Sequence, residues 1–198
     1  MSTKRGNSAE RRPAGPDSQG PDPGPWPPTG LHPELLAAKA SVYDPAGFRC
    51  SRPVPEAESA EYGAHAFTVD GRAVRFRVGK TTPTKAGQFV TVWKRCDGGP
   101  IQPYGIEDPV DLFVISTREG DHFGQFVFPR EVLGERDIVS RNGVGGKRGF
   151  RVYPPWVTAT SRQARSTQAW QVAHFLNVPG DGPADPDRAR ALYHLQRS

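Results

Sequence analysis

The stretch Ala64-His-Ala-Phe-Thr-Val-Asp-Gly-Arg-Ala-Val-Arg-Phe-Arg-Val78 decides the fold. Two short runs in which apolar residues alternate with other residues flank Asp70-Gly71, a pair that favours the tight turn between two antiparallel strands. The sequence therefore predicts a β-hairpin with strands at 64–69 and 72–78.

The second strand of this hairpin has two different faces. Successive side chains of a strand point to opposite sides, so Val74, Phe76 and Val78 share one face. We expect that face to lie in the core, and we expect Arg75 and Arg77 to carry guanidinium groups on the other.

A basic, hydroxyl-rich stretch follows the hairpin. Residues 80–87 read as a Thr-Pro loop, with Lys80, Thr82 and Lys85 among its polar side chains, and 88–94 read as a strand. Such a loop at the mouth of a strand suits an anion. Gly79-Lys-Thr81 is not a P-loop, because Val74 stands where that motif needs glycine and Pro83 obstructs the helix that should follow.

The rest of the chain alternates short strands and helices. This pattern predicts an α+β domain, a mainly antiparallel sheet with helices packed on one side. The expected elements are a helix from Thr29 or Gly30 to about Tyr43, a turn at 97–100, strands at 110–117 and 123–128, a helix start at Pro129, a glycine-rich loop at 142–149, a strand at 150–153, and helices at 160–177 and 185–196.

Composition sets the domain boundaries. The chain has 198 residues, 22 of them glycine and 21 proline. Prolines and glycines dominate residues 1–28, which predicts a disordered tail. We expect the domain at 29–178, then a linker and short helix at 179–198. No apolar run could span a bilayer or act as a signal peptide, so a cytoplasmic location is the expectation. The isolated Cys50 and Cys96 favour neither a zinc module nor a disulfide scaffold.

Positive charge is concentrated in the middle of the chain. Residues 72–165 hold 16 Lys and Arg against 9 Asp and Glu, and the net charge of the whole chain is +5. A local positive field attracts phosphate, nucleic acid or acidic surfaces. The glycine-rich loop is flanked by Lys147, Arg148 and Arg151, and its backbone amides could approach a phosphate closely. A solvated basic face remains the alternative.

Carboxylates offer a catalytic alternative. Asp111 lies at the entrance of a strand and Glu58 precedes the hairpin, as in Mg²⁺-dependent nucleases of the PD-(D/E)xK type. The triplet that should carry the second acid and a lysine reads Gln125-Phe-Val127 here. Lys80, Lys94 or Lys147 would then have to supply the charge. In this hypothesis Asp111 and Glu58 bind Mg²⁺ or Mn²⁺ and Lys80 assists. Otherwise Asp111 caps or turns the chain. The scattered histidines predict no metal site.

Several stretches resemble the MepB-like family of bacterial proteins. They are Glu58-Ser-Ala-Glu-Tyr-Gly63, Lys80-Thr-Thr-Pro-Thr-Lys-Ala-Gly-Gln-Phe-Val-Thr-Val-Trp-Lys-Arg95, Gly124-Gln-Phe-Val-Phe-Pro129, Gly146-Lys-Arg-Gly-Phe-Arg-Val-Tyr-Pro-Pro-Trp156 and Thr167-Gln-Ala-Trp-Gln171. The resemblance covers roughly residues 35–177. It implies a compact cytoplasmic α+β domain similar to nuclease-like, nucleic-acid-associated folds. The family's characteristic residues map onto Lys80, Thr82, Lys85, Gln88, Lys94, Gln125, Lys147, Arg148, Arg151, Gln168 and Gln171.

This set consists of long polar side chains, which suit a binding cleft better than a catalytic centre. The leading hypothesis is a domain that binds DNA, RNA or another phosphate-bearing ligand, in a cleft formed by 80–95, 147–151 and the helix of Gln168 and Gln171. It requires no cofactor and no membrane. The alternatives are the metal-dependent nuclease and a protein-interaction module with an acidic partner.

Overall fold

The computed structural model describes residues 25–27, 29–95 and 99–194. Most of the predicted N-terminal tail, Cys96, part of the turn at 97–100 and the end of the last predicted helix lie outside these residues. Trp26 belongs to the fold, since its ring packs against Tyr43 and Phe67.

The domain is built on a six-stranded sheet in the order β1-β2-β3-β8-β9-β11. The pair β3–β8 is parallel, and the other pairs in this sheet are antiparallel. The mainly antiparallel α+β class is therefore confirmed. The strands are β1 (Val54–Pro55), β2 (His65–Val69), β3 (Arg72–Val78), β8 (Leu112–Glu119), β9 (His122–Pro129) and β11 (Phe175–Val178).

The predicted hairpin is confirmed as β2 and β3. Asp70 and Gly71 have φ of 46° and 80°, the positive values that a two-residue turn of this kind requires. The faces differ from the expectation in one respect. Arg77 is 1% exposed and lies in the interior, because the segment around Glu56 covers its face of the strand.

Two smaller sheets extend from the large one. A three-stranded sheet has the order β10-β5-β4, and a two-stranded ribbon pairs β6 with β7. These strands are β4 (Lys80–Thr82), β5 (Lys85–Thr91), β6 (Trp93–Arg95), β7 (Ile101–Pro103) and β10 (Gly149–Val152). The predicted loop at 80–87 is therefore wrong, since β4 and β5 form a hairpin across Pro83 and Thr84.

The helices pack on the sheets. They are α1 (Pro33–Ala38), which continues as a π-helical turn (Lys39–Tyr43), α2 (Arg130–Glu135), α3 (Arg162–Gln171) and α4 (Pro186–Tyr193). The first helix begins at Pro33, because the His32 side chain caps its first turn. The prediction of one helix over 160–177 is wrong at its end, where a 3₁₀ turn (Val172–His174) leads into β11.

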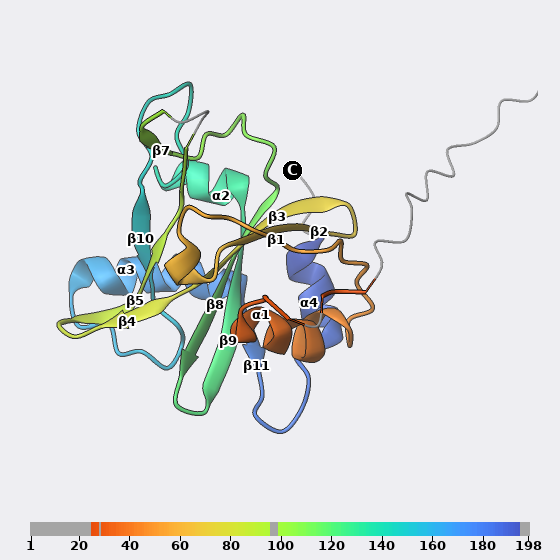
Figure 1. Ribbon diagram of the computed structural model, residues 1–198. Coiled ribbons are helices and arrows are strands. Elements are labelled where there is room, and N and C mark those ends of the chain that lie inside the picture. The colour runs from red at the N-terminus through yellow and green to blue at the C-terminus, as the bar shows by residue number, and fades with distance from the viewer. Residues whose placement is uncertain (1–24, 28, 96–98, 195–198) are drawn as a thin grey trace, which may run out of the picture.

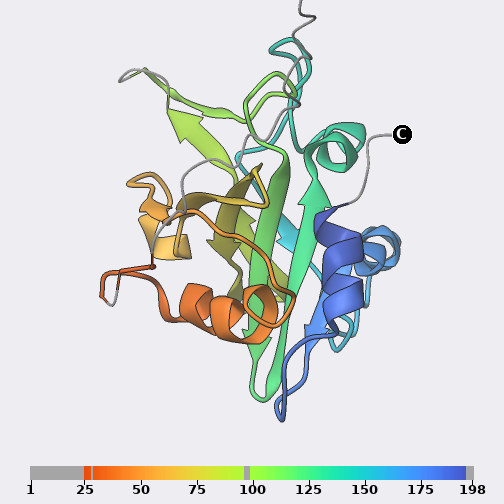
Figure 2. The ribbon, with the colours of Figure 1, turned by 90° about the vertical axis from the view of Figure 1, so that its right-hand side faces the viewer.

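The large sheet separates two apolar clusters. Alternate residues of β8 face opposite sides, so Leu112 and Val114 belong to one cluster while Phe113 and Ile115 belong to the other. Helices α1 and α4 cover the first cluster, and the small sheet with α2 and α3 covers the second (Figure 1). Helices therefore lie on both faces of the large sheet, and the prediction that they pack on one side is wrong, because each face carries its own apolar cluster. Figure 2 shows α1 and α4 side by side on one face of the sheet. On the side of the second cluster, α3 lies beside β10, and a pocket opens next to them.

Among the described residues, no helix combines the length and apolar character needed to cross a bilayer.

Candidate functional site

A pocket of about 750 Å³ lies between the β4–β5 hairpin, β10, α3 and the end of α2. We call it the basic pocket, because the described residues that line it include four cationic side chains and no Asp or Glu. The cations are Lys85, Arg136, Lys147 and Arg151, and the other lining residues are Thr84, Ala86, Ile138, Gly149, Phe150, Tyr153, Thr160, Ser161, Gln163, Ala164, Ser166, Thr167, Trp170 and Gln171.

Arg151 is fixed by the neighbouring hairpin. Its Nη2 donates to Thr82 Oγ1 at 2.6 Å, and its Nη1 lies 3.3–3.4 Å from the carbonyl oxygens of residues 85–87. Since β5 lies between β10 and β4, this guanidinium reaches across the whole small sheet. These contacts hold the guanidinium in one position, and Arg151 also lines the pocket.

Arg136 is held differently. Its guanidinium carbon lies 5.2 Å from the ring centre of Trp170, a cation–π contact between the end of α2 and α3. The two lysines have no such anchor among the described residues. The pocket therefore combines two fixed guanidinium groups with two adaptable ammonium groups.

Helix α3 contributes its first turn to the pocket. Ser161 caps this helix, because its hydroxyl accepts a hydrogen bond from Ala164 N at 3.0 Å. A helix N-terminus carries a partial positive charge and free N–H groups. Both add to the positive potential of the cationic side chains.

The four cations keep their charge uncompensated. Within the part of the chain that the structure describes, none of them forms an ion pair with a carboxylate. Other cations of the central segment do so. Lys94 pairs with Asp108, and Arg95 lies 3.5 Å from Glu58. The basic pocket thus brings together four cations that have no carboxylate partner among the described residues.

Some of the basic residues predicted from the sequence line the pocket, and others do not. Lys85, Lys147 and Arg151 line the pocket together. Lys80 is not among the lining residues, and its ammonium lies 4.5 Å from the ring centre of Tyr62. Arg148 is exposed and also lies outside the lining, although it directly follows Lys147.

The predicted glutamines serve the fold through their amides. Gln88 donates to Arg118 O, and Gln125 accepts from the Tyr193 hydroxyl. Gln168 donates to the carbonyls of Pro154 and Val157. Of the four, Gln171 alone is part of the pocket lining.

Gln171 joins α3 to the edge of β10. The side chain is fully buried, its Oε1 accepts from Tyr153 N at 2.8 Å, and its Nε2 donates to Arg151 O at 2.9 Å. The amide thus occupies the position that a neighbouring strand would take.

The proposed nuclease residues are not gathered around one point. Asp111 Oδ2 accepts from Ala73 N at one end of β3, and Lys80 follows the opposite end. Ala73 and Val78 alone are about 17 Å apart at a rise of about 3.3 Å per residue. Glu58 pairs with Arg95. Within residues 25–27, 29–95 and 99–194, no three His, Cys, Asp or Glu side chains are grouped so that they could hold a metal ion.

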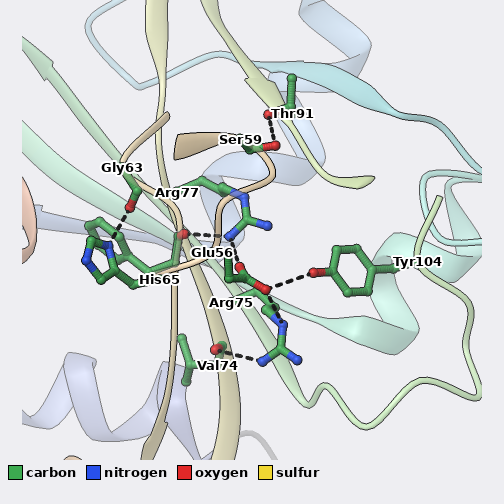
Figure 3. Close-up of polar contacts among 10 residues, drawn as sticks. Glu56, Ser59, Gly63, His65, Val74, Arg75, Arg77, Thr91 and Tyr104 are labelled. Atoms are coloured by element: carbon green, nitrogen blue, oxygen red, sulfur yellow. Dashed lines mark hydrogen bonds and ion pairs between the residues drawn. The ribbon is translucent and has the colours of Figure 1, made fainter. Parts of the chain in front are cut away.

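A second polar cluster surrounds Glu56 on the inner face of β3 (Figure 3). Its Oε2 accepts from Arg77 Nη1 at 2.6 Å, while Oε1 lies 3.2 Å from Arg75 Nε and 3.3 Å from the Tyr104 hydroxyl. Burial and the Glu56 carboxylate raise the pKa of Tyr104. This carboxylate holds the 54–63 segment on the sheet.

Sequence reasoning missed two parts of the pocket. Arg136 has no local motif, since only the packing of α2 on α3 brings it to Trp170. Ser161 carried a usable signal, because a serine before a helical pattern predicts an N-cap.

Comparison with known proteins gives two matches. A family model described as MepB-like matches residues 56–177. A solved structure described as "Crystal Structure of MepB" is 33% identical, with a TM-score of 0.64, and the match covers 74% of this chain and 97% of the other. The search of curated proteins found no relative of this chain.

Proposed function

The chain belongs to the MepB-like family, and we propose that it binds nucleic acid or another phosphate-bearing ligand in the basic pocket. The observation that carries the proposal is the set of four cations, Lys85, Arg136, Lys147 and Arg151, around one cavity whose described lining has no carboxylate. Phosphate groups are the common biological anions that such a set neutralises, and neutralising them releases bound counterions.

The size of the pocket agrees with this ligand class. Ligand pockets usually enclose about 300–1,000 Å³, and this one encloses about 750 Å³. That volume accommodates a nucleotide or a short segment of a strand. Hydroxyl groups of Thr84, Ser161 and Thr167 add neutral donors beside the cations. We place this activity in the cytoplasm, where nucleic acids and nucleotides are abundant.

The nuclease hypothesis has weaker support. It needs two carboxylates and a lysine around one metal ion. Asp111 binds the backbone of Ala73, and Lys80 follows the far end of the same strand. Binding without chemistry accounts for the residues of the basic pocket more simply.

The test is a binding titration that compares two neighbouring basic residues. Labelled single-stranded oligonucleotide, with inorganic polyphosphate as competitor, is titrated with the full chain at low salt. Lys147→Ala should weaken binding about three- to tenfold, because Lys147 lines the pocket. Arg148→Ala removes the same charge outside the lining and should change the affinity less than about twofold. The proposal is wrong if neither ligand binds, or if both variants lose the same affinity.

A further inference from the structure

The outer edge of β10 has the hydrogen-bonding pattern of an unpaired strand. Among the described residues, β10 pairs with β5 alone, and Val92 N donates to Arg148 O at 2.9 Å. Backbone groups of an antiparallel strand alternate between its two neighbours. The N–H and C=O groups of residues 149, 151 and 153 therefore point away from β5, toward α3 and the basic pocket.

Gln171 shows how this edge binds an amide. Its amide donates to the carbonyl of Arg151 and accepts from the N–H of Tyr153. We call such a pair, a carbonyl and the N–H two residues later, one repeat of the edge. The preceding repeat consists of the carbonyl of Gly149 and the N–H of Arg151. No side chain in the described part of the chain bonds to these two groups, and both residues line the basic pocket.

This free repeat offers one acceptor and one donor, spaced as in an amide-to-strand contact. A nucleobase presents the complementary pair on its Watson–Crick edge, where donors and acceptors are adjacent. Thymine, for example, would donate from N3–H to Gly149 O and accept at O4 from Arg151 N. Arg151 and Lys147 line the same pocket as this repeat, and their cationic side chains suit the phosphate of the same nucleotide.

The position of the repeat decides which form of nucleic acid can use it. A protein reads duplex DNA by inserting a helix or a ribbon into a groove. Here the reading groups line a pocket between α3 and the β4–β5 hairpin, so the base must enter the protein. A base can do so only when its Watson–Crick edge is unpaired.

We infer that the basic pocket takes a nucleotide whose base is unpaired, with the base edge bonded to Gly149 O and Arg151 N and the phosphate on Arg151 and Lys147. This inference rests on the proposed phosphate-binding function and names its ligand class. A single strand and a free nucleotide share this chemistry.

The test uses probes that differ in whether a free base edge is available. Oligothymidylate is compared with N3-methylated oligothymidylate, an abasic strand of the same length, and the duplex with oligoadenylate. N3-methylation keeps the charge and the ring but blocks the base edge. The unmodified strand should bind at least about tenfold more tightly than each of the other three.

Two substitutions of one residue locate the contact. Arg151→Ala keeps the backbone N–H. This variant should still bind the unmodified strand about tenfold more tightly than the N3-methylated strand, although it binds both more weakly than the wild type does. Arg151→Pro removes the N–H at an edge position where proline is tolerated, and the two strands should bind equally. Thermal unfolding of each variant is measured to check that it is folded. Thymidine monophosphate and its N3-methyl form are also used as competitors. They show whether the pocket binds a free nucleotide or needs a strand.

The outcomes separate this inference from the proposed function. Equal affinity of the wild-type protein for the unmodified and N3-methylated strands overturns the base contact, while continued binding of the abasic strand leaves phosphate binding intact. Tighter binding of the duplex also overturns the inference. Failure of all probes, including polyphosphate, overturns both.

Discussion

Arg151 Nη2 and Thr82 Oγ1 are 2.6 Å apart, joined by a hydrogen bond that spans β5 from one edge of the small sheet to the other. Neither residue shares a strand with the other, so the contact depends on the hairpin turn at Pro83 and Thr84. It fixes a guanidinium that would otherwise lose entropy when it binds a phosphate.

Removal of the Thr82 hydroxyl should therefore weaken ligand binding. Thr82→Val keeps the branched shape but leaves Arg151 without this acceptor, and the dissociation constant for an oligonucleotide should rise about threefold to fivefold. Thr82→Ser restores the acceptor and should restore most of the affinity. Equal affinities of the Val and Ser variants would show that the hydroxyl does not position Arg151.

Glu56 should contribute strongly to stability. Its carboxylate compensates Arg75 and the almost fully buried Arg77. Glu56→Gln leaves two guanidinium groups without an anion and should lower the free energy of unfolding by about 2–4 kcal/mol in urea titrations. Glu58→Gln is the matched control in the same segment, since Glu58 pairs with the exposed Arg95, and it should change stability by less than about 0.5 kcal/mol. Similar effects of the two variants would contradict this account of the cluster.

Gln171 should stabilise the contact between α3 and β10. Gln171→Leu removes both partners of the β10 edge, so a buried N–H and a buried C=O lose their hydrogen bonds. The expected cost is about 2 kcal/mol in the free energy of unfolding. Gln163→Leu changes an exposed glutamine of the same helix and should cost much less. A stability of Gln171→Leu equal to that of the wild type would refute the role of the amide.

His174 should make stability depend on pH. Partial burial, aided by Arg188, lowers its pKa below the ordinary value of 6.5. The unfolded chain then binds more protons than the folded chain between the two pKa values, so stability falls as pH decreases from about 7 through this range. His174→Gln should reduce the loss of melting temperature between neutral and mildly acidic pH. His32, whose pKa burial also lowers, accounts for part of the remaining slope. An unchanged slope in His174→Gln would argue against this assignment.

Local chemistry made the first hairpin predictable. Asp70 and Gly71 encode their own turn, and the alternation of 72–78 encodes the strand. The hairpin of β4 and β5 was not predictable in this way, because Lys80–Thr82 gains its strand geometry from pairing with β5. The same limit explains the helix predicted over 160–177. Leu176 fits a helical stripe, yet pairing with Gln125 of β9 holds it in β11.

The positive charge of the site could be predicted from the sequence. The contacts of its glutamine side chains could not. Lys85, Lys147 and Arg151 lie in a segment with excess positive charge, and that excess by itself indicates an anion site. A glutamine carries no comparable signal, since its sequence position does not reveal whether its amide faces solvent or the backbone. Gln88 and Gln171 both bind backbone groups in the interior. Arg136 enters the pocket through helix packing, which no local pattern encodes.

The salt dependence of binding tests the basic pocket most directly. The logarithm of the association constant for a single-stranded oligonucleotide is measured against the logarithm of salt concentration, from about 50 to 200 mM, for the wild type and the Lys85→Ala/Lys147→Ala double variant. Each lost phosphate contact reduces the slope by about 0.7, so the double variant should show a slope smaller by about 1.4. An unchanged slope would mean that these lysines touch no phosphate and would contradict the proposed function.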